Sequence, residues 1–281
     1  MQYINEFLRF PGGKAKCLTL SYDDGVQQDQ QLCDLMETYG IAGTFNINSG
    51  SYSPEGKVFP EGEAHRRMTQ AEAQALYSRS PLFEVATHAY THPRLQLLQP
   101  VHIIHQIYED RKAIEQLYGG ICRGHAYPFG TYNRQVMDCL RDCGIVYART
   151  VQSTEKFAQP EDFLQWHPTC HHNNPRLMEL ADKFLSDERL TAPRLFYLWG
   201  HTYEFEEDNN WQVIEDFFKK VGGREDVWYA TNIQYYDYIQ AYNQLRWSLE
   251  GDRIYNPTAT DVWVKLGKET YCIPAGQTLT L

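Results

Sequence analysis

The segment Cys17-Leu18-Thr19-Leu20-Ser21-Tyr22-Asp23-Asp24-Gly25 is a short apolar run that ends in two adjacent carboxylates and a glycine. An amphipathic stretch follows over residues 28–39, with its apolar side chains on one helical face, and Gly40 ends it. This pattern predicts a buried strand, a polar turn and a helix. It is the first unit of a series.

Apolar runs and amphipathic stretches alternate in this way from about residue 15 to residue 245. The expected strands lie at 16–21, 42–47, 82–87, 122–127, 145–149, 195–200 and 227–230. The expected helices lie at 28–39, 69–78, 101–118, 132–143, 174–189, 208–220 and 232–245. This alternation predicts an α/β fold with a parallel sheet, and seven or eight units favour a closed or nearly closed (β/α) barrel over an open doubly wound sheet.

The sequence pattern changes after about residue 246. Gly251-Asp252 separates two short apolar runs, and Gly267-Lys268-Glu269 separates two more. Both patterns predict β-hairpins. We therefore expect a main domain over residues 1–245 and a small β appendage over residues 246–281 that packs on it.

Charge and composition exclude several classes of partner. The net charge is −10, from 26 basic and 36 acidic residues, which argues against nucleic acid and anionic membrane surfaces as partners. No apolar run approaches the roughly 20 residues that span a bilayer. The N-terminal residues lack the pattern of a signal peptide, and the 7 cysteines show no paired spacing, so we expect a cytoplasmic protein.

Residues of the recurring motifs follow four of the predicted strands directly. These residues are Asp23-Asp24, His88, Pro128-Phe129 and His201. Because active sites on parallel sheets lie at the carboxyl ends of the strands, we expect these residues to meet at one edge of the sheet.

The residue types at this edge indicate a metal centre. His88 and His92 are four residues apart, and one carboxylate with two histidines is a common protein contribution to a catalytic zinc ion. The second carboxylate could then act as a base beside a metal-bound water. Taken singly, each motif also has a structural explanation, as a capped turn or as ordinary surface histidines. Together they predict a metal-dependent hydrolase.

At this point the chain resembles the polysaccharide deacetylase family, which carries the NodB homology domain (carbohydrate esterase family four). Residues 21–25 look like the family's Thr-Phe-Asp-Asp-Gly motif, and residues 88–92 match its two histidines, with Ala89 in place of Ser or Thr. The resemblance covers about residues 15–245 and implies a distorted (β/α) barrel. It implies Asp23 as the catalytic base.

The same resemblance implies a ligand set for the metal ion. Asp24, His88 and His92 correspond to the family's metal ligands. Zinc is the expected ion, with cobalt, nickel, manganese and iron as alternatives.

The family's third motif aligns with Ala126-Tyr127-Pro128-Phe129-Gly130. The Phe129 backbone N–H would then be the donor to the oxyanion. Ala126 stands where the family has the arginine that orients the base. Arg123 and Arg149 are both candidates to replace it, and the sequence does not choose between them.

The last two motifs lie nearer the C-terminus. The segment from Leu195 to His201 is similar to the family's strand that ends in the general acid, which implies that role for His201. Candidate substrate contacts are Tyr127, Trp166, Trp199 and His172, although Trp166 could equally pack beneath a loop.

A further histidine cluster and a run of acids lie near these motifs. His167, His171 and His172 invite a second metal site, but no carboxylate is spaced to join them, so substrate contact is favoured. The acids at 204 and 206–208 are interpreted as the solvated start of a helix.

The favoured function is removal of acetyl groups from an N- or O-acetylated sugar, an oligosaccharide in a cytoplasmic setting. One alternative is a hydrolase of non-peptide C–N bonds in small molecules. Another is a non-catalytic metal-dependent carbohydrate-binding protein, of which Ala126 would be a symptom.

Overall fold

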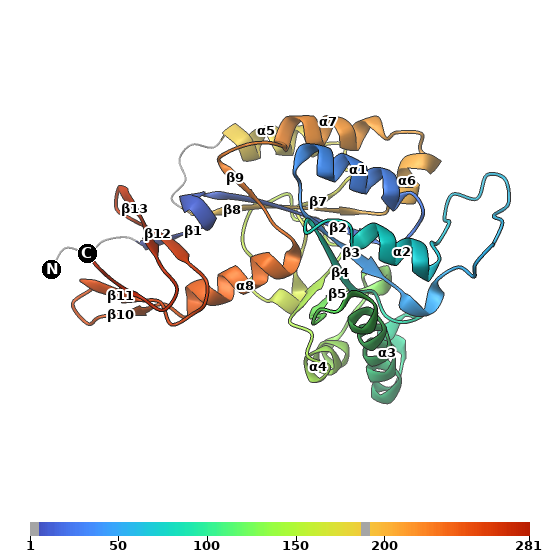
Figure 1. Ribbon diagram of the computed structural model, residues 1–281, viewed down its shortest axis with the longest axis horizontal. Helices are drawn as coiled ribbons and strands as arrows, with labels where there is room; N and C mark the ends of the chain where they lie inside the picture. The colour runs from blue at the N-terminus through green and yellow to red at the C-terminus, as the bar shows by residue number, and fades with distance from the viewer. Residues whose placement is uncertain (1–5, 187–191) are drawn as a thin grey trace.

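A computed structural model describes residues 6–186 and 192–281. Eight strands form one curled sheet in the order β6-β5-β4-β3-β2-β8-β7, with β9 also paired to β2 (Figure 1). These strands are β2 (Lys16–Asp23), β3 (Gly43–Ile47), β4 (Phe83–Thr87), β5 (Gly124–Ala126), β6 (Tyr147–Arg149), β7 (Cys170–His171), β8 (Arg194–Gly200) and β9 (Val227–Tyr229). All pairs in this sheet are parallel, which confirms the predicted fold class.

Eight α-helices accompany the strands within the described part of the chain. They are α1 (Asp29–Tyr39), α2 (Gln70–Tyr77), α3 (Pro100–Tyr118), α4 (Arg134–Asp142), α5 (Leu177–Ser186), α6 (Thr202–Glu207), α7 (Gln212–Val221) and α8 (Asn232–Asn243). In Figure 1, α1, α5 and α7 lie above the sheet, and α3, α4 and α8 lie below it. None of these helices is long and apolar enough to cross a bilayer.

Local sequence explains where several helices begin and end. Gly40 ends α1 in the left-handed region, with φ 64°, where glycine has no steric penalty. Thr69 and Glu72 form a capping box at the start of α2, which satisfies two backbone N–H groups reciprocally. The expected helix 174–189 is observed as α5, and its last three residues lie outside the described residues.

The central strand β2 organises the sheet. All eight of its residues are buried. It pairs with β8 along most of its length, with β9 at its start and with β3 at its end. Its apolar side chains pack into the core, and the buried hydroxyls of Thr19 and Ser21 have hydrogen-bond partners.

The two expected hairpins are present in the C-terminal residues. They are β10 (Arg246–Trp247) with β11 (Arg253–Tyr255), and β12 (Val262–Leu266) with β13 (Glu269–Ile273). Two strands without a sequence signal complete these small sheets: β1 (Glu6–Arg9) pairs with β12, and β14 (Thr278–Thr280) pairs with β11. The appendage is therefore joined to the N-terminal part of the chain through β1. The division at residue 245 stays a prediction.

Candidate active site

Asp23 ends β2 as a buried carboxylate with fixed partners. Its side chain is 3% exposed, and Asn46 donates to its Oδ1 at 2.9 Å. The Arg149 guanidinium contacts its Oδ2. Burial alone would raise the pKa of Asp23, but the charges of Arg149 and His201 outweigh it and lower the pKa. Asp23 is therefore an ionised carboxylate held in one orientation.

The two candidate arginines lie in different places. Arg149, at the end of β6, is 1% exposed and reaches Asp23. Arg123 forms a surface ion pair with Asp237, with 2.5 Å between Nη2 and Oδ2. Of the two arginines that the sequence left open, Arg149 is therefore the one that contacts Asp23. It is the register partner of Ala126 on the neighbouring strand.

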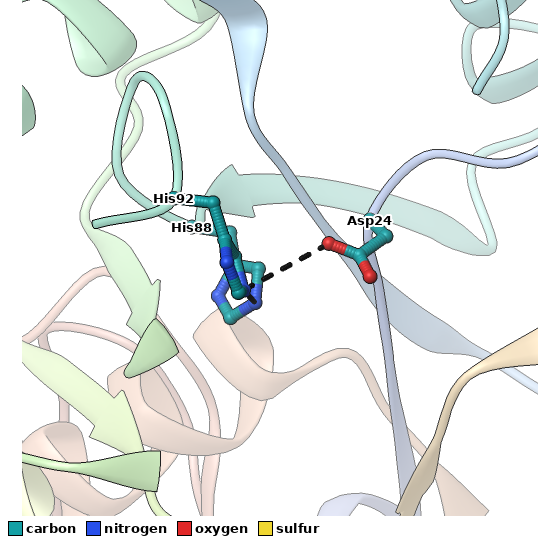
Figure 2. A group of neighbouring side chains, drawn as sticks. All are labelled: Asp24, His88 and His92. Carbon is teal, nitrogen blue, oxygen red and sulfur yellow. Dashed lines mark hydrogen bonds and ion pairs between the residues drawn. The ribbon is translucent and has the colours of Figure 1, made fainter. Parts of the chain in front are cut away.

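Asp24, His88 and His92 converge at the carboxyl edge of the sheet. One ligand atom from each lies within 4.8 Å of the others. Figure 2 shows the Asp24 carboxylate directed at the two imidazoles. The Nε2 atoms of His88 and His92 are 3.2 Å apart, and Asp24 Oδ1 is 4.0 Å from His92 Nε2.

This arrangement fits a divalent metal ion. Two nitrogens each about 2.0–2.1 Å from a tetrahedral zinc ion would be about 3.3 Å apart. The Ala126 carbonyl lies 2.7 Å from Nδ1 of His88, which fixes that proton and leaves Nε2 as the ligand atom. Burial lowers the pKa of His88 and lowers that of His92 to about 4, so both rings are neutral near pH 7.

The loops that carry the ligands adopt unusual backbone conformations. Asp24, Ala89 and His92 have φ of 82°, 62° and 57°, in the left-handed region. Such residues cost about 1–3 kcal/mol each and persist where the surroundings over-determine them. Tertiary contacts therefore hold these loops in shape.

One source of such contacts is an arm formed by residues 52–69, which the sequence did not indicate. His65 Nε2 lies 3.0 Å from Asp24 Oδ2, and Arg67 donates to Asp24 Oδ1 at 3.0 Å. Burial would raise the pKa of Asp24, but the hydrogen bond from His65 and the charge of Arg67 lower it. Asp24 is thus an ionised carboxylate.

A second source is the buried Asp110 of α3. It accepts from the His88 backbone N–H at 3.0 Å and from the Ser49 N–H at 2.7 Å. Burial raises the pKa of Asp110 to about 7. This carboxyl ties the histidine loop and the start of the arm to one helix.

His201 lies on the other side of Asp23. Its Nε2 is 3.8 Å from Asp23 Oδ2, and its Nδ1 is 3.0 Å from Glu204 Oε1. Burial would lower the pKa of His201, but Glu204 and Asp23 raise it above the ordinary value. His201 is therefore poised to carry a proton beside Asp23.

The interpretation of Glu204 as a solvated helix residue is wrong. Its Oε2 is 3.1 Å from His171 Nε2 and 3.0 Å from His172 Nε2. Glu204 is the carboxylate that the sequence could not assign to this cluster, because it enters from α6, beyond β8.

The donors and acceptors at Glu204 decide how this cluster is used. His171, His201 and Glu204 are close enough to hold a metal ion. However, the Asn173 N–H donates to Nδ1 of His171 at 3.1 Å, so a neutral His171 carries its proton on Nε2, the atom nearest Glu204. This favours a carboxylate surrounded by imidazole N–H groups over a second metal site.

The remaining predicted site residues divide by whether they lie beside the site. Phe129, with φ 59°, is 50% exposed, and its ring centroid is 4.5 Å from that of His92. The Trp199 ring lies 4.4 Å below the Arg149 guanidinium and 5.7 Å from the His201 ring. Both residues therefore border the site.

Tyr127, Trp166 and His172 are buried, with at most 1% of each exposed. Tyr127 donates to the Leu164 carbonyl at 2.8 Å, and Trp166 packs among aromatic rings of the core. His172 stacks on Phe205, with 4.1 Å between centroids. In this conformation these three side chains offer no surface to a substrate.

Comparisons with known proteins agree with this fold. Residues 11–148 match the family model described as polysaccharide deacetylase. A structure from Mycobacterium smegmatis, described as a polysaccharide deacetylase, superposes with a TM-score of 0.60 at 16% sequence identity. The match covers 84% of this chain and 94% of that structure's chain. The Xyl-CE4 domain of a multidomain xylanase from the hindgut metagenome of Trinervitermes trinervoides gives 0.54 at 13% identity, over 81% and 92%. No curated protein matches the chain.

Proposed function

Because residues 11–148 belong to the polysaccharide deacetylase family, we propose that this protein is a metal-dependent hydrolase that removes acetyl groups from an N- or O-acetylated oligosaccharide. The observation that carries the proposal is the buried Asp23–Arg149 pair beside the converging Asp24, His88 and His92. A structural ion pair alone would not need three metal-ligating groups next to it.

Asp24, His88 and His92 would hold the metal ion. Two neutral imidazoles and a carboxylate suit zinc, with cobalt, nickel, manganese and iron as alternatives. When bound, such an ion polarises a carbonyl and brings the pKa of a bound water towards about 7.

The other residues have separate tasks. Asp23, ionised and oriented by Arg149, takes a proton from the attacking water. The Phe129 backbone N–H is our candidate donor to the developing oxyanion. His201 gives a proton to the departing amine or hydroxyl, and Glu204 keeps it protonated for that step.

One observation keeps a second candidate function open. An amine leaves only once it is protonated, and the surroundings of His201 favour its protonated form. The same site would therefore suit hydrolysis of non-peptide C–N bonds in a small molecule. A non-catalytic carbohydrate-binding role is less well supported, because Asp23, Arg149 and His201 serve no purpose in metal binding alone.

We also propose a cytoplasmic location. All seven cysteines are free thiols, five of them buried. Free thiols of this kind are typical of a reducing compartment.

The test measures acetate release and bound zinc together. Acetylated chito-oligosaccharides and acetylated xylo-oligosaccharides are offered with added zinc or cobalt. We expect Asp23→Asn to lose about 10²–10⁴-fold in rate while it still binds zinc. Asp24→Asn should lose both rate and zinc. Turnover that is unaffected by Asp23→Asn would remove the proposed base.

A further inference from the structure

The Arg67 guanidinium joins the two loops that carry the metal ligands. Its Nη1 donates to the Asp24 carbonyl at 2.7 Å and to Asn48 Oδ1 at 2.8 Å. Its Nη2 donates to Asp24 Oδ1 at 3.0 Å. Arg67 therefore holds both the strained backbone of Asp24 and its ligand oxygen.

Asn48 continues the connection to the histidines. Its Nδ2 donates to the Ala89 carbonyl at 2.8 Å and also to the His88 carbonyl. Asp24, Arg67, Asn48 and the His88–His92 loop thus form one unbroken chain of hydrogen bonds. It links ligands that are more than sixty residues apart in the sequence.

The backbone of the arm places Arg67 independently of its side chain. Arg67 bridges Val26 in antiparallel fashion, and the Met68 N–H donates to the Gly25 carbonyl at 3.0 Å. The neighbouring Gln27 N–H donates to the Arg66 carbonyl at 2.7 Å. A change of the Arg67 side chain should therefore leave the arm in place.

We propose that Arg67 is a positioning residue of the metal centre, whose forked hydrogen bonds set the spacing between Asp24 and the His88–His92 loop and thereby the metal affinity. This inference rests on the metal site of the proposed function. It concerns a residue that none of the recognised motifs contains.

The charge and the shape of Arg67 have opposite effects on a bound cation. A positive charge beside Asp24 opposes cation binding, so only the geometry of the fork can make Arg67 favourable. Lysine keeps the charge but is a single point donor on a flexible stem. It cannot reproduce the three contacts that the planar guanidinium makes. Arg67→Lys therefore removes the geometry and spares the charge.

The experiment compares Arg67→Lys with Arg66→Lys in the full chain. Arg66 is the matched control, because it lies on the same arm but pairs with Glu206, away from the ligands. Zinc affinity is measured by competition with a chromophoric chelator, and the ligand geometry by the visible absorption of the cobalt-loaded protein. Loss of a partner of this kind typically weakens metal affinity about 10–100-fold.

We expect that loss and a changed cobalt spectrum for Arg67→Lys, and wild-type behaviour for Arg66→Lys. Asn48→Ala should weaken zinc binding similarly, and adding it to Arg67→Lys should cost little more, because both interrupt one connection. Asn48→Ala also tests the inference if Arg67→Lys fails to fold. Wild-type affinity in Arg67→Lys would overturn the inference alone. Failure of the wild-type chain to bind zinc would overturn the proposed metal site as well.

Discussion

Ala126 and Arg149 occupy the same register position on the neighbouring strands β5 and β6. Side chains of directly paired residues lie on the same face of a sheet. Arg149 therefore starts one strand farther from Asp23 and still reaches its carboxylate. Arg149 thus supplies, from another position in the chain, the positive partner of the base that we propose.

Replacement of Arg149 by alanine should lower kcat/KM about 100-fold or more. Asp23 would lose the charge that orients it and keeps it ionised, and a buried carboxylate would be left without its partner. Initial rates of acetate release measure the effect, with circular dichroism to verify folding. Arg123→Ala, which removes only a surface ion pair, is the control and should retain its rate.

The double variant Ala126→Arg with Arg149→Ala tests the exchange directly. It returns the arginine to the neighbouring strand and vacates the space that Arg149 fills. We expect part of the lost rate to return. A double variant no faster than Arg149→Ala would show that the two positions are not equivalent.

Replacement of His201 by glutamine should affect amides more than esters. An amine is a poor leaving group until it is protonated, whereas an alcohol needs less assistance. We expect a loss of about 10²–10⁴-fold on an N-acetylated oligosaccharide and a smaller loss on an O-acetylated one. Equal losses on both substrates would contradict the role of His201 as the acid.

Replacement of Glu204 by glutamine should move the alkaline limb of the pH–rate profile. Glu204 accepts from His201 and helps to raise its pKa, against burial, with Asp23 and Asp24 also facing the ring and His171 beside it. Without the carboxylate the pKa of His201 falls, so the protonated acid is lost at lower pH. We expect a shift towards acid, because the protonated imidazole loses a charge-assisted hydrogen bond.

The pKa of His201 can also be followed by NMR without substrate. A lower pKa of the His201 imidazole in Glu204→Gln would support the role of Glu204, even if the chosen substrates react slowly. An unchanged titration would contradict it.

Asp29 should make the protein less stable as pH rises. It is fully buried, accepts from Thr202 and Tyr77, and has a pKa raised by burial to about 7. The folded state therefore binds more protons than the unfolded state between about pH 4 and 7, and the free energy of unfolding falls across that window. Asp29→Asn cannot titrate, so its stability relative to wild type should improve from pH 4.5 to pH 7.5 by about 3 kcal/mol.

Urea unfolding of both proteins at the two pH values measures this difference. Other buried carboxyls, such as Asp110, titrate in both proteins and cancel. Parallel pH dependence in the two proteins would mean that Asp29 is ionised in the folded state.

The large sheet could be predicted because its strands have a recognisable local sequence pattern. All seven expected strands are observed, because most of them are short apolar runs that lie between stretches of helical length. β7 has only two residues and α6 only six, too few for a periodic pattern. β1 could not be predicted from local sequence, because its partner β12 lies at the opposite end of the chain.

The site was predictable where its residues are adjacent in the chain. Asp23 is adjacent to Asp24, and His88 and His92 are four residues apart, so their spacing in the sequence was enough to predict the metal site. Arg149 could not be chosen over Arg123, because the choice depends on the register between β5 and β6. His65 and Arg67 lie on an irregular arm, and only tertiary hydrogen bonds bring them to Asp24. No local pattern carries that information.

One of the ion pairs that hold the arm is more exposed to solvent than the other. The Arg66–Glu206 ion pair, 2.7 Å between Nη1 and Oε1, is partly open to water, with side chains 25% and 42% exposed, whereas Arg67 and Asp24 are more enclosed. Dissolved electrolyte screens solvent-exposed charges much more than enclosed ones. Raising the ionic strength should therefore weaken the outer attachment of the arm before the inner one, so the part of the arm around Arg66 detaches while Arg67 still holds Asp24.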